Sequence, residues 1–191
     1  MRLVFASNND HKLQEVRAIM PADIEVLSLN EIGFVQEIEE TGRTLEENSR
    51  IKAETVAAFM KDKMLIDGIF ADDTGLEIDA LHGAPGVYTA RWAGEPAANR
   101  RKALEELKGK ENRTAQFRTV VTLIRGGQTQ QVEGVVRGRI AEAESGTAGF
   151  GYDSLFIPEG YNCTFAELSS EEKNRISHRG RALEALVKIL K

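Results

Sequence analysis

The segment "IFADDTGLEIDAL" (residues 69–81) carries two adjacent carboxylates, Asp72 and Asp73, directly after an apolar run. That run belongs to the segment "MLIDGIFA" (residues 64–71), which is predicted to form a β-strand that ends at the Asp pair. The tetrapeptide "DDTG" that follows has Asp at its first position and Gly at its fourth, which favours a β-turn. A single polar residue is enough to end a strand, so the second carboxylate leaves a functional interpretation open beside the turn.

Strands and helices alternate on either side of this segment, which predicts an α/β fold. Further strands are expected over residues 2–6, 24–29, 115–125 and 128–143, and helices over residues 11–20, 97–109, from Thr44 to about Lys61 or Lys63, and twice within residues 169–191. Gly126 and Gly127 join two of these strands and form a hairpin signal, so the sheet is expected to be mixed. A chain of 191 residues with no internal repeat is predicted to form one domain, residues 1–191.

The bulk composition narrows the possible classes of protein. The formal net charge is −5, which argues against a nucleic-acid partner whose phosphate backbone must be neutralised. No uninterrupted apolar stretch approaches the ~20 residues that span a bilayer, so no membrane partner is expected. The lone cysteine, Cys163, excludes an internal disulfide and fits a reducing compartment. The sequence therefore predicts a cytoplasmic protein.

The loop "SNNDHK" (residues 7–12) lies between a predicted strand and a predicted helix, a junction where phosphates commonly bind to free backbone N–H groups. Ser7, Asn8 and Asn9 offer side-chain donors. Lys12 places a cation in the first helical turn, where it opposes the helix dipole unless an anion joins it. Ordinary capping by Asn9 or Asp10 is the alternative, and the loop taken alone favours capping.

The helix from Thr44 buries a charge. Glu47, three residues after Thr44, completes a capping box. Lys52 falls near the centre of the apolar stripe of this helix, and Asn48 lies on its edge; the stripe consists of Leu45, Val56, Phe59 and Met60. A lysine that faces the core needs a partner, because burying its bare charge is costly. We expect an anionic partner, from the protein or from a ligand.

The segment "GTAGFGYD" (residues 146–153) sets three glycines around two rings, Phe150 and Tyr152. Glycines allow a backbone to approach a ligand closely, and an exposed ring can stack on a base. Asp153 follows and can accept hydrogen bonds. The alternative is a turn whose aromatic side chains enter the core.

The segment "ISHRG" (residues 176–180) places His178 and Arg179 in the first turn of the last helix, where cations are disfavoured. Lys173 lies in the preceding short helix and is expected to point to the same place. Solvated surface charge is the alternative. Taken together, these segments offer cations for phosphates, carboxylates for a metal, a ring for a base and donors for its edge. They predict a nucleotide site with Mg²⁺, a hard cation that prefers oxygen ligands.

Five segments in this order resemble the inosine triphosphate pyrophosphatase family, the XTP/dITP diphosphatases: "SNNDHK", "EETGRTLEENSRIKA", "ADDTGLEIDALHGAPGVYTARWAG", "GTAGFGYD" and "EEKNRISHRG". The resemblance covers essentially the whole chain. It implies an elongated α/β fold whose mixed sheet spreads into two lobes around a cleft, and a homodimer. It also implies Mg²⁺-dependent hydrolysis of non-canonical purine nucleoside triphosphates (ITP, dITP, XTP) to the nucleoside monophosphate and pyrophosphate.

The same resemblance assigns roles to individual residues. The triphosphate is expected to be lined by Ser7, Asn8, Asn9, Asp10, His11 and Lys12, and to be reached by Lys52. Glu40 and Asp73 are expected to hold Mg²⁺, with Glu39 as an alternative to Glu40, and Asp73 is also the expected general base. Substrate is expected to contact Thr74, and the nucleoside to be surrounded by Phe150, Gly151, Tyr152, Asp153, Lys173, His178 and Arg179. Because neighbouring strand residues point to opposite faces, Asp73 is expected to enter the cleft while Asp72 anchors the turn.

The sequence departs from the family's commonest pattern in small ways. Ser7 stands where Thr is usual, Asn8 where Gly is frequent, and Ala148 where Gly is common. Three other functions remain as alternatives: a Maf-like nucleotide pyrophosphatase of other base specificity, a nucleotide-binding sensor without chemistry, and a single-stranded nucleic-acid module that stacks bases on Phe150 and Tyr152. The segments around Phe150 and His178 favour a purine substrate over the Maf-like alternative.

Overall fold

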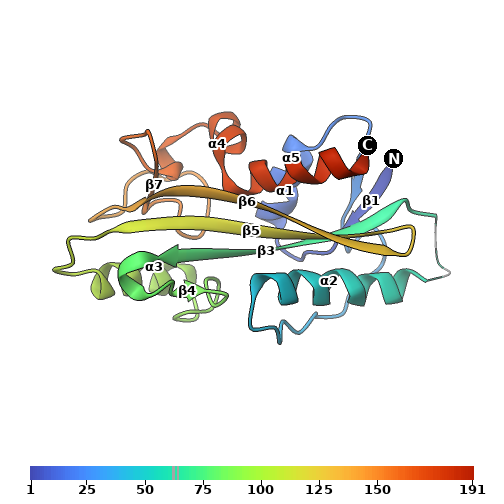
Figure 1. The fold of residues 1–191 in the computed structure, drawn as a ribbon, viewed down its shortest axis with the longest axis horizontal. Coiled ribbons are helices and arrows are strands. Elements are labelled where there is room, and N and C mark those ends of the chain that lie inside the picture. The colour runs from blue at the N-terminus through green and yellow to red at the C-terminus, as the bar shows by residue number, and fades with distance from the viewer. Residues whose placement is uncertain (62, 64) are drawn as a thin grey trace. The chain divides into compact units, whose positions relative to one another are not determined.

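The computed structural model describes residues 1–61, 63 and 65–191, and within them a mixed seven-stranded sheet has the order β2-β1-β3-β5-β6-β7, with β4 paired to β3 (Figure 1). The strands are β1 (Arg2–Phe5), β2 (Glu25–Leu27), β3 (Gly68–Ile78), β4 (Pro85–Gly86), β5 (Thr114–Arg125), β6 (Gln128–Ile140) and β7 (Phe156–Pro158). The helices are α1 (Asp10–Ile19), α2 (Leu45–Met60), α3 (Pro96–Glu106), α4 (Ser170–Ile176) and α5 (His178–Leu190), with 3₁₀ turns η1 (Asp79–Leu81) and η2 (Phe165–Glu167). The predicted α/β class with a mixed sheet is confirmed.

The chain forms two compact units, and the long strands β3, β5 and β6 contribute residues to both. The first unit comprises Met1–Asp73, Thr119–Gly134 and Arg179–Lys191, and the second comprises Thr74–Arg118 and Val135–His178. Each unit is described by itself below. The cleft implied by the family resemblance stays a prediction.

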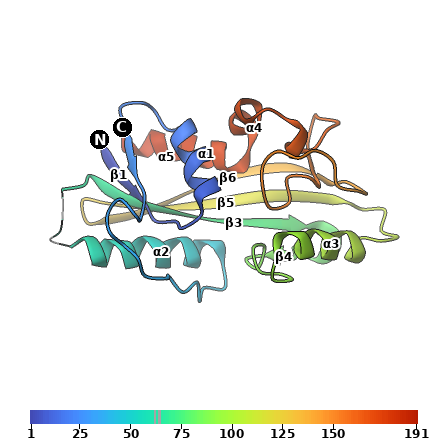
Figure 2. The same ribbon diagram turned by 180° about the vertical axis from the view of Figure 1, so that it is seen from behind.

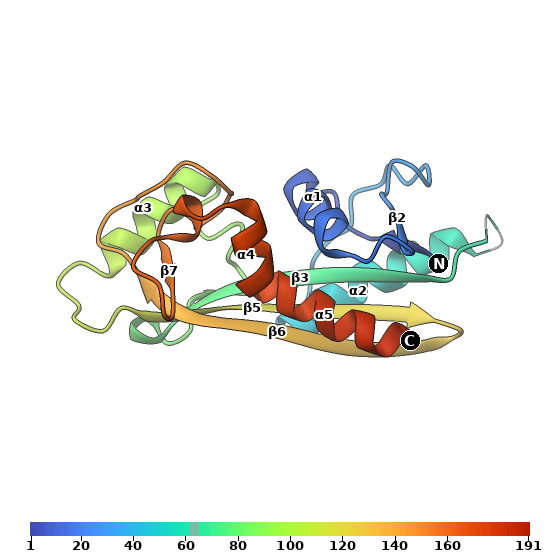
Figure 3. The same ribbon diagram turned by 90° about the horizontal axis from the view of Figure 1, so that it is seen from above.

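In the first unit, β1 pairs in parallel with both β2 and β3, and helices cover both faces of these strands (Figures 1 and 2). Leu3 and Phe5 of β1 pack with α1 and α5 on one face, whereas Val4 packs with α2 on the other. The continuous run "LVF" therefore reflects a strand buried on both sides, as expected in a parallel sheet. Figure 3 shows α5 lying along β5 and β6, where Leu183 and Leu186 join the same cluster as Phe5.

The helices of the first unit begin where the sequence predicts. The side chain of Asn9 accepts a hydrogen bond from the Lys12 N–H and caps α1. The Thr44 hydroxyl accepts from the Glu47 N–H at 3.1 Å and caps α2. The Glu47 carboxylate reaches the N–H of Arg43 rather than that of Thr44, so the predicted capping box closes one residue earlier.

The second unit has a core of aromatic and aliphatic side chains contributed by β3, α3, β5, β6, β7 and η2. Phe117 lies at its centre, with its ring centroid 4.8 Å from that of Phe156 and 6.4 Å from that of Phe165. In the first unit, the hairpin between β5 and β6 turns at Gly126 and Gly127, both of which have positive φ. Two positive φ values suit the tight hairpin turn that this pair of glycines predicts.

The predicted turn at Asp72 and Asp73 is wrong. Strand β3 continues through both residues and ends only at Ile78. Both carboxylates have cationic partners on their own face of the strand, so neither has to leave the ladder to reach water. At its other end β3 begins at Gly68, four residues later than predicted, and Met64 lies outside the described residues. Within the described part of the chain, no helix is both long and apolar enough to cross a membrane.

Replacing Phe70 by alanine is expected to lower the free energy of unfolding by about 3–5 kcal/mol. The ring is fully buried and stacks on Phe5 with centroids 5.0 Å apart, so its removal leaves a cavity between β1 and β3. Urea denaturation measures the change. As a control, Val35→Ala removes a side chain that is 88% exposed and is expected to change stability by less than about 0.5 kcal/mol. Equal effects of the two substitutions would contradict the assignment of Phe70 to the core.

Candidate active site

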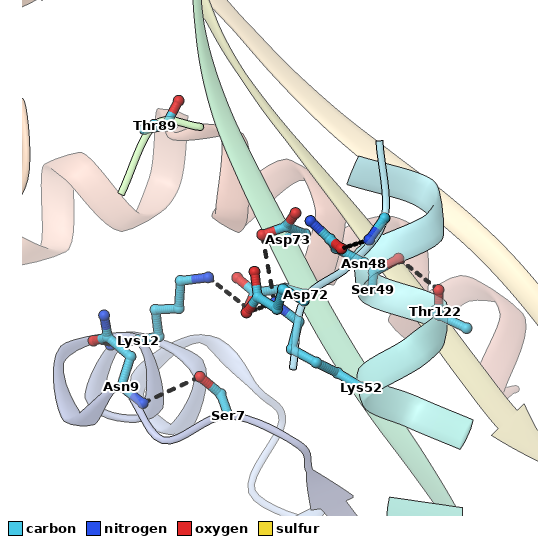
Figure 4. Close-up of polar contacts among 12 residues, drawn as sticks. Ser7, Asn9, Lys12, Asn48, Ser49, Lys52, Asp72, Asp73, Thr89 and Thr122 are labelled. Atoms are coloured by element: carbon cyan, nitrogen blue, oxygen red, sulfur yellow. Dashed lines mark hydrogen bonds and ion pairs between the residues drawn. The ribbon is translucent and has the colours of Figure 1, made fainter. Parts of the chain in front are cut away.

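Asp72 and Asp73 lie on opposite faces of β3 because successive side chains of a strand alternate (Figure 4). Both are nearly inaccessible, with 2% and 7% of their surface exposed. On one face, the Lys12 ammonium of α1 lies 2.9 Å from Asp72 Oδ1. On the other face, the Lys52 ammonium of α2 lies 3.4 Å from Asp73 Oδ1. The carboxylate pair is therefore flanked by one lysine on each side of the sheet.

Asp72 is the anchor of a buried ion-pair network. Arg179, in the first turn of α5, donates from Nε and Nη2 to Asp72 Oδ2 at 3.1 and 3.0 Å, and its Nη1 donates to Glu15 of α1. Burial alone acts to raise the pKa of Asp72, but the charges of Lys12 and Arg179 hold that pKa well below its ordinary value. Asp72 is thus firmly ionised, and it ties α1 and α5 to the centre of β3.

Asp73 has a different environment. Its Oδ1 accepts from Lys52, but its Oδ2 is buried and has no hydrogen-bond partner. Burial raises the pKa of Asp73 above its usual range and outweighs the nearby charges of Lys52 and Lys12. Asp72 is held as a carboxylate, whereas the raised pKa of Asp73 means that this group is easier to protonate than an ordinary aspartate. This contrast between adjacent residues is typical of sites where one carboxylate takes part in chemistry.

Lys52 joins Asp73 to the acidic loop before α2. Its ammonium lies 2.9 Å from Glu40 Oε1, and the side chain is only 8% exposed. Burial acts to lower the pKa of Lys52. The carboxylates of Asp73, Asp72 and Glu40 outweigh burial and raise this pKa. The expectation that this lysine faces the core and meets an anion is confirmed. Of the two candidate metal ligands in the loop, Glu40 turns to the site, whereas Glu39 is exposed.

The donor set around Lys52 fits a magnesium ion. Glu40 and Asp73 both reach the same ammonium, so a carboxylate oxygen from each lies close enough to share one cation. Mg²⁺ is usually held by one or two carboxylates, with waters and substrate phosphates as its remaining ligands. The described residues contain no group of three or more His, Cys, Asp or Glu arranged for a metal, so a site made of protein alone is not formed by them. Two carboxylates plus phosphate oxygens remain the fitting arrangement.

The loop "SNNDHK" shows the capping alternative. Asn9 caps α1, and Ser7 Oγ accepts from the Asn9 N–H at 3.2 Å (Figure 4). Asn8, Asp10 and His11 are exposed. Lys12 is the member of the loop that reaches the carboxylate pair, because its position in the first turn directs it to Asp72. Capping orders the loop and leaves its exposed groups facing solvent, so it does not conflict with phosphate binding.

In the second unit, the predicted nucleoside residues form a cluster around Asp153. Asp153 Oδ2 accepts from Lys173 Nζ at 2.6 Å and from the Phe150 N–H at 2.8 Å. Lys173 Nζ also lies 5.0 Å from the centre of the Phe150 ring. A Cβ on Gly149 would meet Asp153 Oδ2 at 2.1 Å, and its φ is 75°, so glycine is required there. The cluster is held in place by its own hydrogen bonds.

Two further predicted site residues of this unit, Tyr152 and His178, are buried. The Tyr152 ring belongs to the core, and its hydroxyl donates to the Thr89 carbonyl at 2.9 Å. That burial leaves Phe150 as the half-exposed ring of the pair and removes the two-ring platform of the nucleic-acid alternative. His178 stacks on Phe117 with centroids 4.6 Å apart and is 5% exposed. The Gly151 carbonyl accepts a hydrogen bond from Arg100 Nη1. Thr74 lies within β3 and is half-buried.

The structure therefore gathers Lys12, Lys52, Glu40 and Asp73 in the first unit. Arg179 belongs to the same unit, where Asp72 and Glu15 bind it. Phe150, Asp153, Lys173 and His178 gather in the second unit. Sequence reasoning missed Glu15 and the role of Asp72 as partner of Arg179. Glu15 follows Lys12 by three residues in a predicted helix, which is the only signal the sequence offers for it.

The chain matches a known family over nearly its whole length. A profile of the Ham1 family matches residues 3–189. The dITP/XTP pyrophosphatase of Bacillus subtilis (strain 168) is 52% identical to this chain over 194 residues, which cover 98% of this chain and 96% of that protein.

Two solved structures share the fold. The Ham1 protein of Staphylococcus aureus has a TM-score of 0.87 at 39% identity, and that of Coxiella burnetii has a TM-score of 0.88 at 38% identity. Each comparison covers 100% of this chain and 98% of the other. These matches confirm the resemblance drawn from the five sequence segments, and the chain belongs to the Ham1 family.

Proposed function

We propose that this protein hydrolyses non-canonical purine nucleoside triphosphates, such as ITP, dITP and XTP, to the nucleoside monophosphate and pyrophosphate with the help of Mg²⁺. The observation that carries the proposal is Asp73 Oδ2, a buried oxygen that has no hydrogen-bond partner. It belongs to a carboxylate that shares the Lys52 ammonium with Glu40. The names of the relatives support the same activity, since the B. subtilis protein is called a dITP/XTP pyrophosphatase.

The arrangement around Asp73 suits attack of water on the α-phosphorus. Asp73 Oδ2, the buried oxygen without a hydrogen-bond partner, takes a proton from the water. Lys52 and Lys12 orient the triphosphate and balance its negative charge. Glu40 and Asp73 would hold a Mg²⁺ ion, and the chemistry that this ion would supply is positive charge beside the phosphates of the leaving group. The loop from Ser7 to Lys12 remains the proposed phosphate-binding loop.

The purine base is assigned to the cluster around Asp153. Lys173 and His178 offer donors, and Phe150 offers a ring for stacking. A 6-keto purine presents an acceptor where adenine presents an amino donor, so polar groups left unpaired by adenine discriminate against it. Arg179 was predicted beside the base, and its guanidinium is bound by Asp72 and Glu15. Its contribution to base selection is therefore proposed to come through this network.

The proposal also includes assembly as a homodimer and location in the cytoplasm. Both follow from the family resemblance and the composition. A Maf-like pyrophosphatase with another base preference, and a sensor that binds nucleotide without turnover, are the competing functions. A pure triphosphate binder gains nothing from two more carboxylates beside the phosphates, which favours an enzyme.

Incubation of the protein with dITP and Mg²⁺ is expected to yield dIMP and pyrophosphate. Turnover of dATP is expected to be slower. EDTA is expected to abolish both reactions, because removing Mg²⁺ leaves the negative charges of the triphosphate, Glu40 and Asp73 without the divalent cation that balances them. Chromatographic separation of the products identifies the bond that breaks. Release of dIDP and phosphate would contradict the proposed reaction, and tight binding without turnover would favour the sensor.

Replacing Asp73 by asparagine is expected to lower kcat by about 10²–10⁴-fold, because the amide cannot accept the proton of the attacking water. The variant is expected to fold normally. Burial already disfavours the charge on this carboxyl, and Lys52 keeps Glu40 as its partner. Steady-state kinetics and thermal unfolding measure the two effects. Retained turnover would remove Asp73 from the mechanism.

Replacing Arg179 by alanine is expected to lower the free energy of unfolding by about 3–5 kcal/mol, because it leaves Asp72 and Glu15 as buried carboxylates without their shared partner. We also expect the variant to lose part of its preference for hypoxanthine over adenine. Urea denaturation and competition between dITP and dATP measure these effects.

The matched control for Arg179 is Arg175→Ala, which removes the partner of Glu172 in an exposed pair. An exposed ion pair contributes at most about 1 kcal/mol. If the control and Arg179→Ala change stability equally, the buried network does not stabilise α5.

A further inference from the structure

Two buried asparagines hold the loops before their helices in the same way. Asn48 in α2 accepts from the Gly42 N–H at 2.8 Å through its Oδ1. Asn99 in α3 accepts from the Ala93 N–H, which also lies six residues earlier in the chain. The exposed fractions of the two side chains are 0% and 2%. Each amide oxygen is therefore identified by the backbone donor that it faces, which fixes the position of the nitrogen as well.

The amide nitrogens of these two asparagines differ. Nδ2 of Asn99 donates to the carbonyls of Thr89 and Ala90, at 3.4 and 3.1 Å. Nδ2 of Asn48 has no hydrogen-bond partner, although it is buried. A buried donor without a partner is uncommon, because it loses its hydrogen bonds to water and forms none in the protein to replace them. Holding a loop explains the oxygen of Asn48, but it leaves the nitrogen unexplained.

The nitrogen of Asn48 is directed toward Asp73 (Figure 4). Asp73 Oδ2 also lacks a partner, so a buried donor and a buried acceptor face each other without forming a bond. One small molecule that both accepts and donates hydrogen bonds would satisfy both atoms. Water is such a molecule, and a water next to Asp73 is the reactant that the proposed hydrolysis requires.

Asn48 is rigidly placed for this task. A Cβ at position 42 would meet Asn48 Oδ1 at 2.6 Å, so only glycine allows the loop to approach this closely. In the next position of α2, the Ser49 hydroxyl lies 2.7 Å from the Thr122 hydroxyl of β5 and ties the first turns of the helix to the sheet. A donor that is fixed before substrate arrives does not have to reorient during the reaction.

We propose that Asn48 orients the attacking water, donating from Nδ2 to the water oxygen while a water hydrogen points to Asp73 Oδ2. The remaining lone pair of the oxygen then forms the bond to the α-phosphorus. The bond from that phosphorus to the bridging oxygen breaks, and its electron pair leaves with pyrophosphate. The proton passes from water to Asp73. This inference rests on the proposed hydrolysis and adds a residue to its mechanism.

Two substitutions of Asn48 separate its amide nitrogen from its oxygen. Asn48→Asp keeps the acceptor for the Gly42 N–H and loses the donor, whereas Asn48→Ala loses both. The expected result is a fall in kcat for dITP of about 100-fold in both variants. Their affinity for the non-hydrolysable α,β-methylene analogue of dITP, measured by calorimetry, is expected to stay within about threefold of wild type, because a water contact adds little to ground-state binding.

The matched control is Asn99→Asp, in which the carboxylate keeps an acceptor for the Ala93 N–H but loses both donated bonds. It is expected to lower the thermal midpoint while kcat per folded molecule remains close to wild type.

Several outcomes would overturn the inference. If Asn48→Asp keeps the wild-type kcat, the donor is not needed and Asn48 only holds the Glu40 loop. If Asn48→Asp weakens analogue binding in parallel with kcat, the added charge rather than the lost donor is responsible. Should Asn48→Ala fail to fold, Asn48→Asp decides alone by these two criteria. Failure of the wild-type protein to release pyrophosphate from dITP would instead refute the proposed function and, with it, this role of Asn48.

Discussion

The alternation of side chains along β3 is the constraint on which the rest of the site depends. Two adjacent carboxylates in a strand must point to opposite faces, and in a sheet covered on both faces each one is buried. Burial of an unpaired charge is prohibitive, so each face has to supply a cation. Lys12 and Arg179 supply it for Asp72, and Lys52 supplies it for Asp73. Each of the helices α1, α2 and α5 thus contributes a cation that meets one of the two carboxylates of β3.

The two carboxylates have different surroundings, which suit an anchoring role for Asp72 and the proposed role of Asp73 as the base. Asp72 is saturated by a lysine and a bidentate arginine, so its pKa is low and it acts as a permanent anion that holds two helices. Asp73 has one longer contact and one oxygen without a partner, so burial is less well compensated and raises its pKa. A firmly ionised anchor can therefore lie next to the carboxylate proposed to react.

The sequence predicted most of the elements and the residue types of the site. Apolar periodicity located α1 and α2, and the Gly126–Gly127 pair located the long hairpin. The buried position of Lys52 followed from its place in the apolar stripe of α2. The continuation of β3 through Asp72 and Asp73 could not be predicted, because turn propensity is local while the cations that keep the strand extended come from residues 12, 52 and 179. Asn48 was visible only as a residue at the edge of a stripe. Its significance depends on an unpartnered atom, which no sequence pattern reports.

The central claim is that Asp72 stabilises the fold while Asp73 performs the chemistry, and Asp72→Asn tests it most directly. Urea denaturation and dITP kinetics on the same preparation measure stability and turnover together. The account predicts a loss of about 3–5 kcal/mol in the free energy of unfolding, because Arg179 and Lys12 lose their buried counter-charge, with kcat per folded molecule close to wild type. Unchanged stability combined with loss of turnover would contradict it, since Asp72 would then be the reactive carboxylate.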